Sequence, residues 1–509
     1  MNNRCLLIAL GLAALCVCQY DVTVLERKCT PVDRCPVIDP DYAGIVIPSN
    51  IAPLNFTVAE PGRGCCAMVS SKHGKPISIS GNGMSISIPA GPWKNLLEKN
   101  KGGLLRLDLY VRDTAGQWRK FKTIEDTIAD FPIDRYCTYR SLNFVYNYST
   151  DLRIVERDLG SYKESLLLST KNYAWGCCNC HTPNNNNPNS FVMQSRSSRF
   201  GSATLLAVDG KISKLNTKLG YPAWHPGGRI IAFSVNKVQQ CFHSAGNSFV
   251  DFYDNNSDIV IYDVAGRKIT IVPQLNQPQV LETWPNWSPD GRYLYFCSAP
   301  ILWTDFKKVP PDNFNKVKFG LFRVAYDEAQ AAWGPVDTVL SPEKTGLSIS
   351  QPRMSPDNRF ILFCMHEYGG YPNTQKSSDL YIMECAAGTL RRLDINSASS
   401  ESWHGWSTNG RWILFSSKRD NGKFTRIYFS FVDSGGNAHK PFIMPQKDPA
   451  FYQSCIKYYN FPEFATAPVS FSEREILSVV RSPEKTDVPV PEAPPATAGA
   501  SEWQALRPR

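Results

Sequence analysis

The apolar and polar positions in the second half of the chain follow one pattern four times. Each copy is an apolar segment, a turn of the Ser-Pro-Asp-Gly type and a second apolar segment, and the copies begin at Tyr221, Trp284, Gln351 and Trp403. Such turn residues close β-turns, so each copy predicts two strands joined by a turn. A second predicted hairpin follows each copy, as at residues 258–272. Four strands in a repeat of about fifty to sixty-five residues predict the blades of a β-propeller, because so small a sheet must bury its faces against neighbours.

Other segments extend the predicted propeller. Residues 191–193 and 203–208 are apolar and predict a degenerate earlier blade, so that residues 182–446 hold five blades. A sixth blade is expected if residues 136–170 contribute strands, and this leaves five and six blades open. The aromatic residues of 447–481 predict a segment that packs on the propeller, and the Pro- and Ala-rich residues 482–509 predict a disordered tail.

The first part of the chain shows short strands of a different kind. Segments within residues 41–135 alternate polar and apolar positions, as at 77–80 and 84–88, and residues 81–83 predict a hairpin turn. Strands at this spacing predict a β-sandwich-like domain. Residues 19–40 precede it as a disulfide-tied leader, and residues 136–181 connect it to the propeller. The predicted fold class is all-β, a β-sandwich-like domain followed by a five- or six-bladed β-propeller.

The N-terminus predicts export. Within residues 1–18, one Arg is followed by about a dozen apolar residues, which is typical of a secretory signal peptide and too short for a membrane span. Cys16 and Cys18 are candidate sites for a lipid anchor, although Leu15 and Val17 stand where a small residue is usual. No later segment is apolar over eighteen residues. We therefore expect a location in the periplasm or outer envelope and no transmembrane span.

Composition argues against two classes of function. The net charge of +9 is modest for 509 residues, and Lys and Arg are spread without runs, so a nucleic-acid partner is not expected. The chain contains no Gly-x-Ser-x-Gly elbow and no α/β domain after the propeller, so little supports a hydrolase. Catalytic residues are therefore not predicted.

The 16 cysteines fit an oxidising compartment. Cys297 and Cys364 lie in apolar strands and are expected to be buried thiols. Spacing alone does not give the disulfide connectivity. Cys29 and Cys35, which bracket a short loop in the leader, are one candidate pair. One or both of the adjacent Cys65 and Cys66 are candidates to pair with Cys137.

One motif carries candidate chemistry. Cys177, Cys180 and His181 have the C-x-x-C-H spacing that attaches a c-type haem, with two thioethers to the haem vinyl groups and the histidine as proximal iron ligand. A structural disulfide is the main alternative, and zinc is a weaker one because no second cysteine pair has the required spacing. Cys178 adds a third thiol within the motif.

Propeller geometry nominates a distal ligand. The motif precedes the first propeller strands, so we expect it on the face that holds the crossovers between blades. His404 precedes an inner strand, which lines the channel, and is the first candidate; His243 is the second, with Met193 and Met365 as alternatives. His225 lies in a turn on the opposite face and is expected to be structural.

The repeat and several other sequence segments resemble a known family. The Pro-x-Trp-Ser-Pro-Asp-Gly-Arg blades resemble the TolB-like propeller repeat of bacterial envelope proteins. The C-x-x-C-H segment and further segments look like one envelope family of Bacteroidetes and related bacteria, usually labelled TolB-like or cytochrome c biosynthesis proteins; the further segments are residues 51–56, 214–218, 221–226, 242–244 and 445–452. The resemblance covers roughly residues 40–466 and implies a propeller in the cell envelope. Cys178 and the long tail depart from it.

Two functions follow from these observations. The first is an exported propeller with one covalent haem c, which transfers electrons or presents haem to an envelope partner. The second is a haem-free propeller that binds protein or glycan and is stapled by disulfides.

Overall fold

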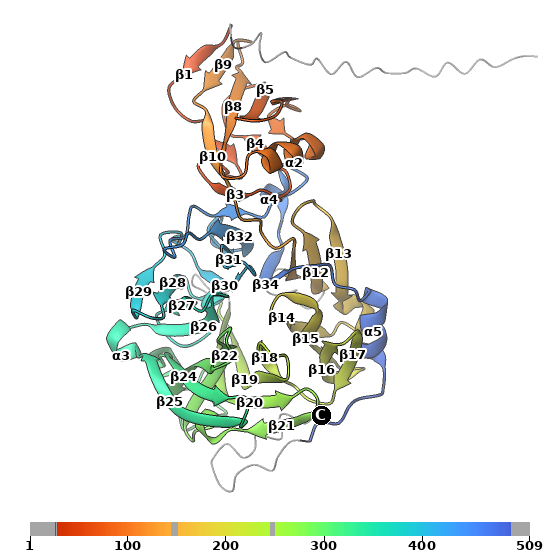
Figure 1. Ribbon diagram of the computed structural model, residues 1–509, viewed down its shortest axis with the longest axis vertical. Coiled ribbons are helices and arrows are strands. Elements are labelled where there is room, and N and C mark those ends of the chain that lie inside the picture. Colours follow the sequence, from red (N-terminus) through yellow and green to blue (C-terminus); the bar gives the residue numbers. More distant parts are fainter. Residues whose placement is uncertain (1–25, 27, 144–150, 245–249, 490–509) are drawn as a thin grey trace, which may run out of the picture.

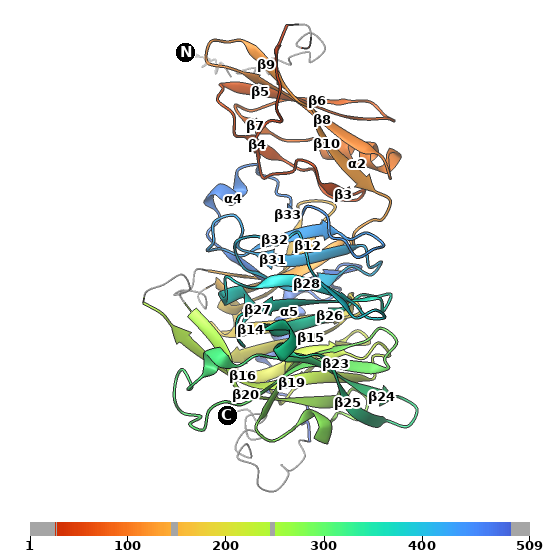
Figure 2. The ribbon, with the colours of Figure 1, turned by 90° about the vertical axis from the view of Figure 1, so that its left-hand side faces the viewer.

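The computed structural model describes residues 26, 28–143, 151–244 and 250–489, with the backbone but not the side chain of Cys180. These residues form two parts stacked along the long axis of the molecule (Figures 1 and 2). An N-terminal domain stands on the edge of a disc of four-stranded sheets. No helix in the described ranges is long and apolar enough to cross a bilayer.

The N-terminal domain contains a larger and a smaller sheet. The larger sheet has the order β1-β9-β8-β10-β3, with β5 beside β8 and β6 beside β5, and the smaller has the order β2-β4-β7. The strands are β1 (Thr30–Val32), β2 (Ile38–Asp39), β3 (Val46–Pro48), β4 (Phe56–Val58), β5 (Gly64–Ser71), β6 (Ile77–Ser80), β7 (Ser85–Ile86), β8 (Leu104–Arg112), β9 (Trp118–Phe121) and β10 (Ile124–Ala129). Both sheets contribute to one hydrophobic core, as expected for the predicted sandwich-like domain.

This domain begins earlier than predicted and includes a helix. Strand β1 pairs with β9 and β2 pairs with β4, so part of the predicted leader belongs to the sheets. Helix α2 (Ala90–Lys99) buries Trp93, Leu96 and Leu97, which lie on one helical face. The residues on both sides of this short helix alternate between polar and apolar positions and predict strands, so the sequence pattern does not reveal the helix.

The disc is a six-bladed propeller within the described residues. Blade I contains β34 (Tyr458–Ala465), β11 (Tyr136–Leu142), β12 (Arg153–Asp158) and β13 (Glu164–Ser169); blade II contains β14 (Cys177–Asn184), β15 (Asn187–Ser197), β16 (Gly201–Val208) and β17 (Lys211–Leu215); blade III contains β18 (Gly220–Trp224), β19 (Ile230–Phe242), β20 (Val250–Asp263) and β21 (Lys268–Ile271). Blade IV contains β22 (Val280–Trp287), β23 (Tyr293–Pro300), β24 (Gly320–Asp327) and β25 (Ala332–Leu340); blade V contains β26 (Ser348–Met354), β27 (Phe360–His366), β28 (Asp379–Glu384) and β29 (Thr389–Arg392); blade VI contains β30 (Glu401–Trp406), β31 (Trp412–Ser417), β32 (Arg426–Phe431) and β33 (Phe442–Ile443).

The ring closes by pairing the two ends of the propeller sequence. Strand β34, from the segment predicted only to pack on the propeller, is the inner strand of blade I and pairs antiparallel with β11. The predicted connector 136–181 supplies the other three strands of blade I and the start of blade II. Without β34, blade I would have three strands and β11 would lack a partner on the side of the channel, which explains why the C-terminal strand joins the first blade.

The two parts of the molecule share a continuous core. Trp412 of blade VI donates its indole N–H to the Phe131 carbonyl at 3.0 Å, and Thr408 donates through its backbone N–H and hydroxyl to Asp134. Buried side chains of both sheets and of blades V and VI form one hydrophobic cluster. The N-terminal domain is therefore packed firmly on blade VI.

The C-terminal segment runs across the outside of blades I and II. Helix α5 (Glu473–Arg481) begins with a capping box between Ser472 and Glu475. After it, Thr486 forms a bridge to Leu215 of β17, and Val488 is buried. Part of the predicted disordered tail is thus ordered, and the remainder lies outside the described residues. The shorter helices are α3 (Pro342–Thr345) and α4 (Phe451–Ser454).

Candidate functional site

The inner strands share one irregularity. In each blade the pairing with the next strand shifts by one residue, which is a β-bulge, and the bulged pair is Cys180–His181 in β14 and Trp403–His404 in β30. The other four blades have Pro at the histidine position. The preceding residue has a positive φ at Tyr221, Trp284, Gln351, Trp403 and Phe461, which bulky side chains rarely adopt. His181 is therefore explained by the blade repeat as well as by the haem motif.

Aromatic side chains at the bulges narrow the central channel. The ring centroids of Trp403 and Phe461 are 3.6 Å apart, those of Tyr221 and Trp284 are 6.1 Å apart, and Tyr371 packs on both Tyr221 and Trp403. We call these five residues the aromatic collar. Beside the aromatic collar, the channel has a free volume of about 40 Å³, enough for a few waters. A larger ligand cannot pass the collar.

The channel widens on the face that holds the loops between the second and third strands of the blades. There it opens into a cavity with a free volume of about 990 Å³, which we call the mouth. Its walls include residues after β11 and β31, the second half of β19 and the starts of β14 and β18. This volume matches that of cavities that bind small molecules.

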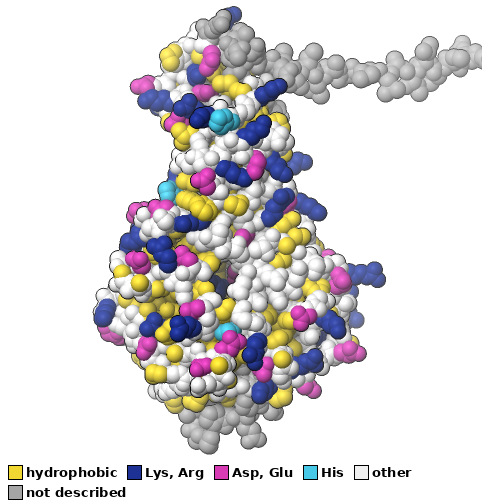
Figure 3. All heavy atoms as spheres, in the orientation of Figure 1, with side chains coloured by type: hydrophobic (Ala, Val, Ile, Leu, Met, Phe, Trp, Pro, Cys, Tyr) yellow, Lys and Arg dark blue, Asp and Glu magenta, His cyan; other side chains and the backbone are white. Residues whose placement is uncertain are grey.

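The charged side chains that line the mouth are all basic. Among the described residues, its lining contains neither Asp nor Glu, and the cations are Arg140, Arg196, Lys218, Lys237, Lys418 and Lys423. Over the molecular face drawn in Figure 3, basic and acidic side chains are instead interspersed. A cavity lined by one sign of charge concentrates ligands of the opposite sign.

Lys418 is the cation of the mouth with the least compensation. It is partly buried, and its ammonium group has neither a hydrogen bond nor an ion pair among the described residues. Its backbone is fixed, because its N–H donates to the Ser400 carbonyl at 3.1 Å and its carbonyl accepts from the Gly422 N–H at 2.8 Å. Burial lowers the pKa of Lys418 to about 8, although the negative charge of Asp251 acts to raise it.

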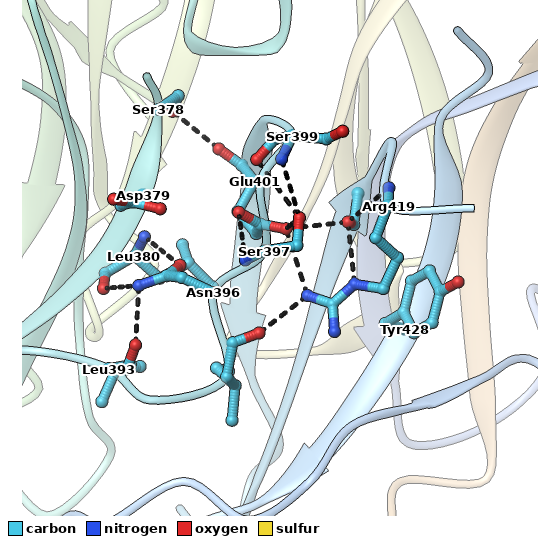
Figure 4. A network of polar contacts seen from close by, with 12 residues as sticks. Ser378, Asp379, Leu380, Leu393, Asn396, Ser397, Ser399, Glu401, Arg419 and Tyr428 are labelled. Carbon is cyan, nitrogen blue, oxygen red and sulfur yellow. Dashed lines mark hydrogen bonds and ion pairs between the residues drawn. The ribbon is translucent and has the colours of Figure 1, made fainter. Parts of the chain in front are cut away.

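The next residue, Arg419, belongs to a closed polar network (Figure 4). Its Nη2 donates to Glu401 Oε1 at 3.1 Å and to the Ile395 carbonyl at 2.8 Å, and its guanidinium lies over the Tyr428 ring at 4.6 Å. Glu401, which is fully buried, also accepts from the hydroxyls of Ser397 at 2.7 Å and Ser417 at 2.9 Å. Burial raises the pKa of Glu401, and the Arg419 charge opposes that rise.

The C-x-x-C-H motif lies in strand β14 rather than in a connector. Cys177 lines the mouth, and Nη2 of Arg196 is 3.8 Å from its sulfur. Cys178 is fully buried in the core shared by blades I and II. The side chain of Cys180 lies outside the described part of the structure. The expected face is correct for Cys177, while His181 lies deeper, in the channel wall.

His181 is 5% exposed, and neither of its ring nitrogens has a hydrogen-bond partner of good geometry among the described residues. Burial lowers the pKa of His181 to about 4, and the Arg140 charge acts in the same direction, against the backbone carbonyls of Thr138 and Phe461. Unpartnered buried nitrogens cost free energy, so this imidazole has the capacity for a ligand that the chain does not supply.

These residues fit a haem in their chemistry but not in their conformation. Two cysteines and a histidine with free nitrogens are the donor set of haem c, and the mouth beside Cys177 is large enough for an organic cofactor. However, β14 is extended, and a strand rises roughly 3.3 Å per residue, so Cys177 and His181 are separated by roughly 13 Å of strand. Attachment to one haem therefore requires β14 to bend.

His404, the predicted distal ligand, has partners at both ring nitrogens. Nε2 donates to the Leu362 carbonyl at 3.1 Å, and Nδ1 is 3.6 Å from the Cys364 sulfur. Burial lowers the pKa of His404 to about 3, so the ring is neutral. Both ring nitrogens of His404 thus connect blade VI to blade V, and its role as distal ligand stays a prediction.

The other predicted ligands are distributed over several sites. His243 is on the expected face, but its Nε2 is 2.9 Å from Asp251 Oδ2. Met193 and Met365 are each 1% exposed within blade cores. His225 is buried in the turn after β18, with Nε2 at 3.2 Å from the Gly291 carbonyl and its ring against Trp287, in agreement with the expected structural role.

The predicted disulfides are not formed. All five candidate cysteines are free thiols in the structure: Cys29, Cys35, Cys65, Cys66 and Cys137. Cys65 and Cys66 are buried in β5 of the N-terminal domain, whereas Cys137 is in β11 of the propeller. Cys297 and Cys364 are buried thiols, as predicted.

Sequence reasoning missed Lys418 and the other mouth cations. They come from blades I, II, III and VI, and apart from Lys218, which ends the segment 214–218, none stands in a motif singled out in the sequence. One signal was available, because Lys418 directly follows the second strand of the fourth repeat, and propeller geometry places such loops on the face of the mouth.

Comparisons with known proteins add little to this site. No protein-family model matches the chain. An uncharacterized protein of Agrobacterium fabrum is 28% identical over 179 residues, which cover 35% of this chain and 48% of that protein, so the match spans about half of the relative. Among solved structures, an oligogalacturonate lyase from Vibrio parahaemolyticus has a TM-score of 0.34 at 12% identity, covering 79% of this chain and 97% of that one. A nidogen/laminin complex has a TM-score of 0.37 at 9% identity, covering 64% and 96%. The propeller assignment rests on the six sheets described above.

Proposed function

We propose that this protein is a binding protein whose propeller mouth takes a small, ring-bearing organic anion. The observation that carries the proposal is Lys418, a partly buried ammonium group without a partner among the described residues, in a cavity whose lining is basic. A buried charge without a counter-charge costs free energy, so a site that keeps one is built for an anion.

Among the described residues, no carboxylate lines the mouth. Asp251 attracts Lys418, but its Oδ2 already accepts from His243 at 2.9 Å and is 3.5 Å from the Tyr368 hydroxyl. The negative charge is therefore expected from a ligand.

The walls of the mouth favour a ligand with a ring. The collar residues Tyr221, Tyr371, Trp403 and Phe461 form part of the lining, and Trp175 at the mouth is 56% exposed. Aromatic faces stack on flat or apolar ring faces and also attract cations, so they place a ring between the basic groups. A free volume of about 990 Å³ suits a small molecule rather than a protein surface.

Calorimetric titration tests this proposal with phenyl phosphate as the ring-bearing anion, benzyl alcohol as the neutral ring and inorganic phosphate as the anion without a ring. We expect phenyl phosphate to bind most tightly and Lys418→Met to weaken it by about tenfold or more. Lys423→Met, at an exposed lysine of the same mouth, is the matched control. Equal binding of benzyl alcohol, or unchanged binding by Lys418→Met, would contradict the proposal.

The second candidate function is a covalent haem c carrier. It is favoured by the two ring nitrogens of His181, which lack a hydrogen bond of good geometry to any described residue, and by the Cys177 thiol at the mouth. Cys177 and Cys180 would hold the haem and His181 would be its proximal ligand, and the bound haem would supply electron transfer or small-ligand binding. Export to the envelope and a redox partner there remain part of this proposal.

Haem staining of the denatured protein, after expression with the haem-attachment machinery, separates the two candidates. A haem carrier keeps its colour through acid–acetone extraction, and His181→Ala shifts its Soret band. A colourless chain with the mass of the bare polypeptide excludes the haem carrier and leaves the anion-binding proposal intact.

A further inference from the structure

We propose that the Lys418 amine forms an imine with an anionic aldehyde or ketone held in the mouth. This inference rests on the proposed anion binding and goes beyond it, because it assigns a covalent step to one residue. Lysine amines react with carbonyl compounds in many proteins when burial keeps part of the amine unprotonated.

The position of Lys418 suits a nucleophile. Its backbone is held by the hydrogen bonds to Ser400 and Gly422, so the side chain extends from a fixed point into the mouth. An amine engaged with a carboxylate would have its protons committed to that partner, and Lys418 has no such partner among the described residues. Lys423 lines the same mouth but is exposed.

The surroundings of Lys418 favour the neutral amine. The pKa of about 8 means that a useful fraction of the amine is unprotonated near neutral pH. The nearest acidic influence is Asp251 of β20, whose carboxylate is shared with His243 and Tyr368. The other cations of the mouth, such as Arg140 and Arg196, add positive charge that attracts the negative group of the ligand.

The proposed step balances without an oxidant or a further reactant. The nitrogen lone pair of Lys418 attacks the carbonyl carbon and a C–N bond forms. The carbonyl oxygen leaves as water, with the two hydrogens that the amine nitrogen loses, and a C=N double bond remains. The ligand class is therefore a ring-bearing aldehyde or ketone with a phosphate or carboxylate group.

Reductive trapping tests the step. The full-length chain is incubated near neutral pH with pyridoxal 5′-phosphate, an anionic aromatic aldehyde, and sodium borohydride then reduces the imine to a stable amine. Mass spectrometry of a digest locates the label. We expect Lys418 to be labelled about tenfold faster than Lys423. Equal labelling of the two lysines, or no label on Lys418, would overturn the proposal.

Variants and an analogue separate this inference from the proposed function. Lys418→Arg keeps the positive charge and should lose the label at this position. Lys268→Arg, at an exposed lysine of β21 outside the mouth, should be labelled at Lys418 as fast as the wild type. Pyridoxine 5′-phosphate carries an alcohol in place of the aldehyde and reports anion binding alone. If it binds but Lys418 is not trapped, the imine is excluded and anion binding stands; if it does not bind and nothing is trapped, both fall.

Discussion

Lys418 and Arg419 are neighbours in one loop of blade VI, yet their environments are opposite. Arg419 has a buried carboxylate, a hydroxyl, a carbonyl and two aromatic rings around its guanidinium. Lys418 faces the mouth without a partner among the described residues. Blade VI therefore contains enough polar groups to pair a cation, so a shortage of such groups does not explain why Lys418 lacks a partner among the described residues. The difference indicates that Arg419 holds the blade together and that Lys418 is kept for a ligand.

Removal of Arg419 should give the largest effect on stability. Arg419→Met leaves Glu401 buried without its counter-charge, and we expect the free energy of unfolding in urea to fall by about 3–5 kcal/mol. The control is Arg392→Met, because Arg392 pairs with Asp379 at 2.7 Å in a partly exposed site, and such pairs contribute about 0–1 kcal/mol. Equal losses in the two variants would remove the contrast on which this account depends.

The bulge histidines repeat the contrast between partnered and unpartnered groups. The pKa of His181 is lowered to about 4 and that of His404 to about 3, from an ordinary value of 6.5. As the pH falls, the unfolded chain therefore binds protons at these histidines before the native state does. The free energy of unfolding falls by about 3 kcal/mol or more per histidine between pH 6.5 and 4.

Unfolding in urea as a function of pH checks this expectation. His181→Gln and His404→Gln should each flatten the loss of stability below pH 6.5. At neutral pH, His404→Gln should cost more, because it removes the hydrogen bond to the Leu362 carbonyl, whereas His181 has no hydrogen bond of good geometry to another described residue. A pH dependence that neither variant changes would show that these rings are not buried as described.

Removal of Lys418 should act on stability in the opposite direction to removal of Arg419. Lys418→Met replaces a partly buried charge by an apolar side chain of similar length, so we expect the free energy of unfolding to rise by about 1 kcal/mol without ligand. The thermal stabilisation by phenyl phosphate should be lost in the same variant. A destabilised Lys418→Met would mean that the chain itself provides a partner for this lysine.

Glu282 should give the smallest effect. It occupies the position in blade IV that Glu401 occupies in blade VI, two residues before the bulge, but no arginine of the described ranges pairs with it. Burial raises the pKa of Glu282 to about 9, so it is protonated at neutral pH, and Glu282→Gln should cost less than about 1 kcal/mol. Glu401→Gln should cost more, since it leaves Arg419 unpaired; equal costs in urea denaturation would contradict this reading.

The sequence predicted the blades well because their signals are local. Strands β22 and β23 follow directly from the apolar segments around a Ser-Pro-Asp-Gly turn. The closure of blade I was missed because β34 and β11 are separated by most of the propeller, and alternation within a strand does not identify its partner.

The site was harder to predict than the fold. The C-x-x-C-H motif was placed in a connector, since its cysteines and asparagines do not resemble a strand, yet β14 is held extended by pairing with β15. The environment of Lys418 depends on the packing of β31 beside the mouth and on Asp251 of β20, which no local pattern reports. Charge and burial at this site arise from the tertiary structure alone.

The most direct test is the pKa of the Lys418 amine, measured by NMR on isotopically labelled lysine with and without phenyl phosphate. The account predicts a value near 8 in the free protein, and a rise when the anion binds, because an opposite charge stabilises the ammonium form. An ordinary lysine value in the free protein, or a value that phenyl phosphate leaves unchanged, would contradict the assignment of the mouth as an anion site.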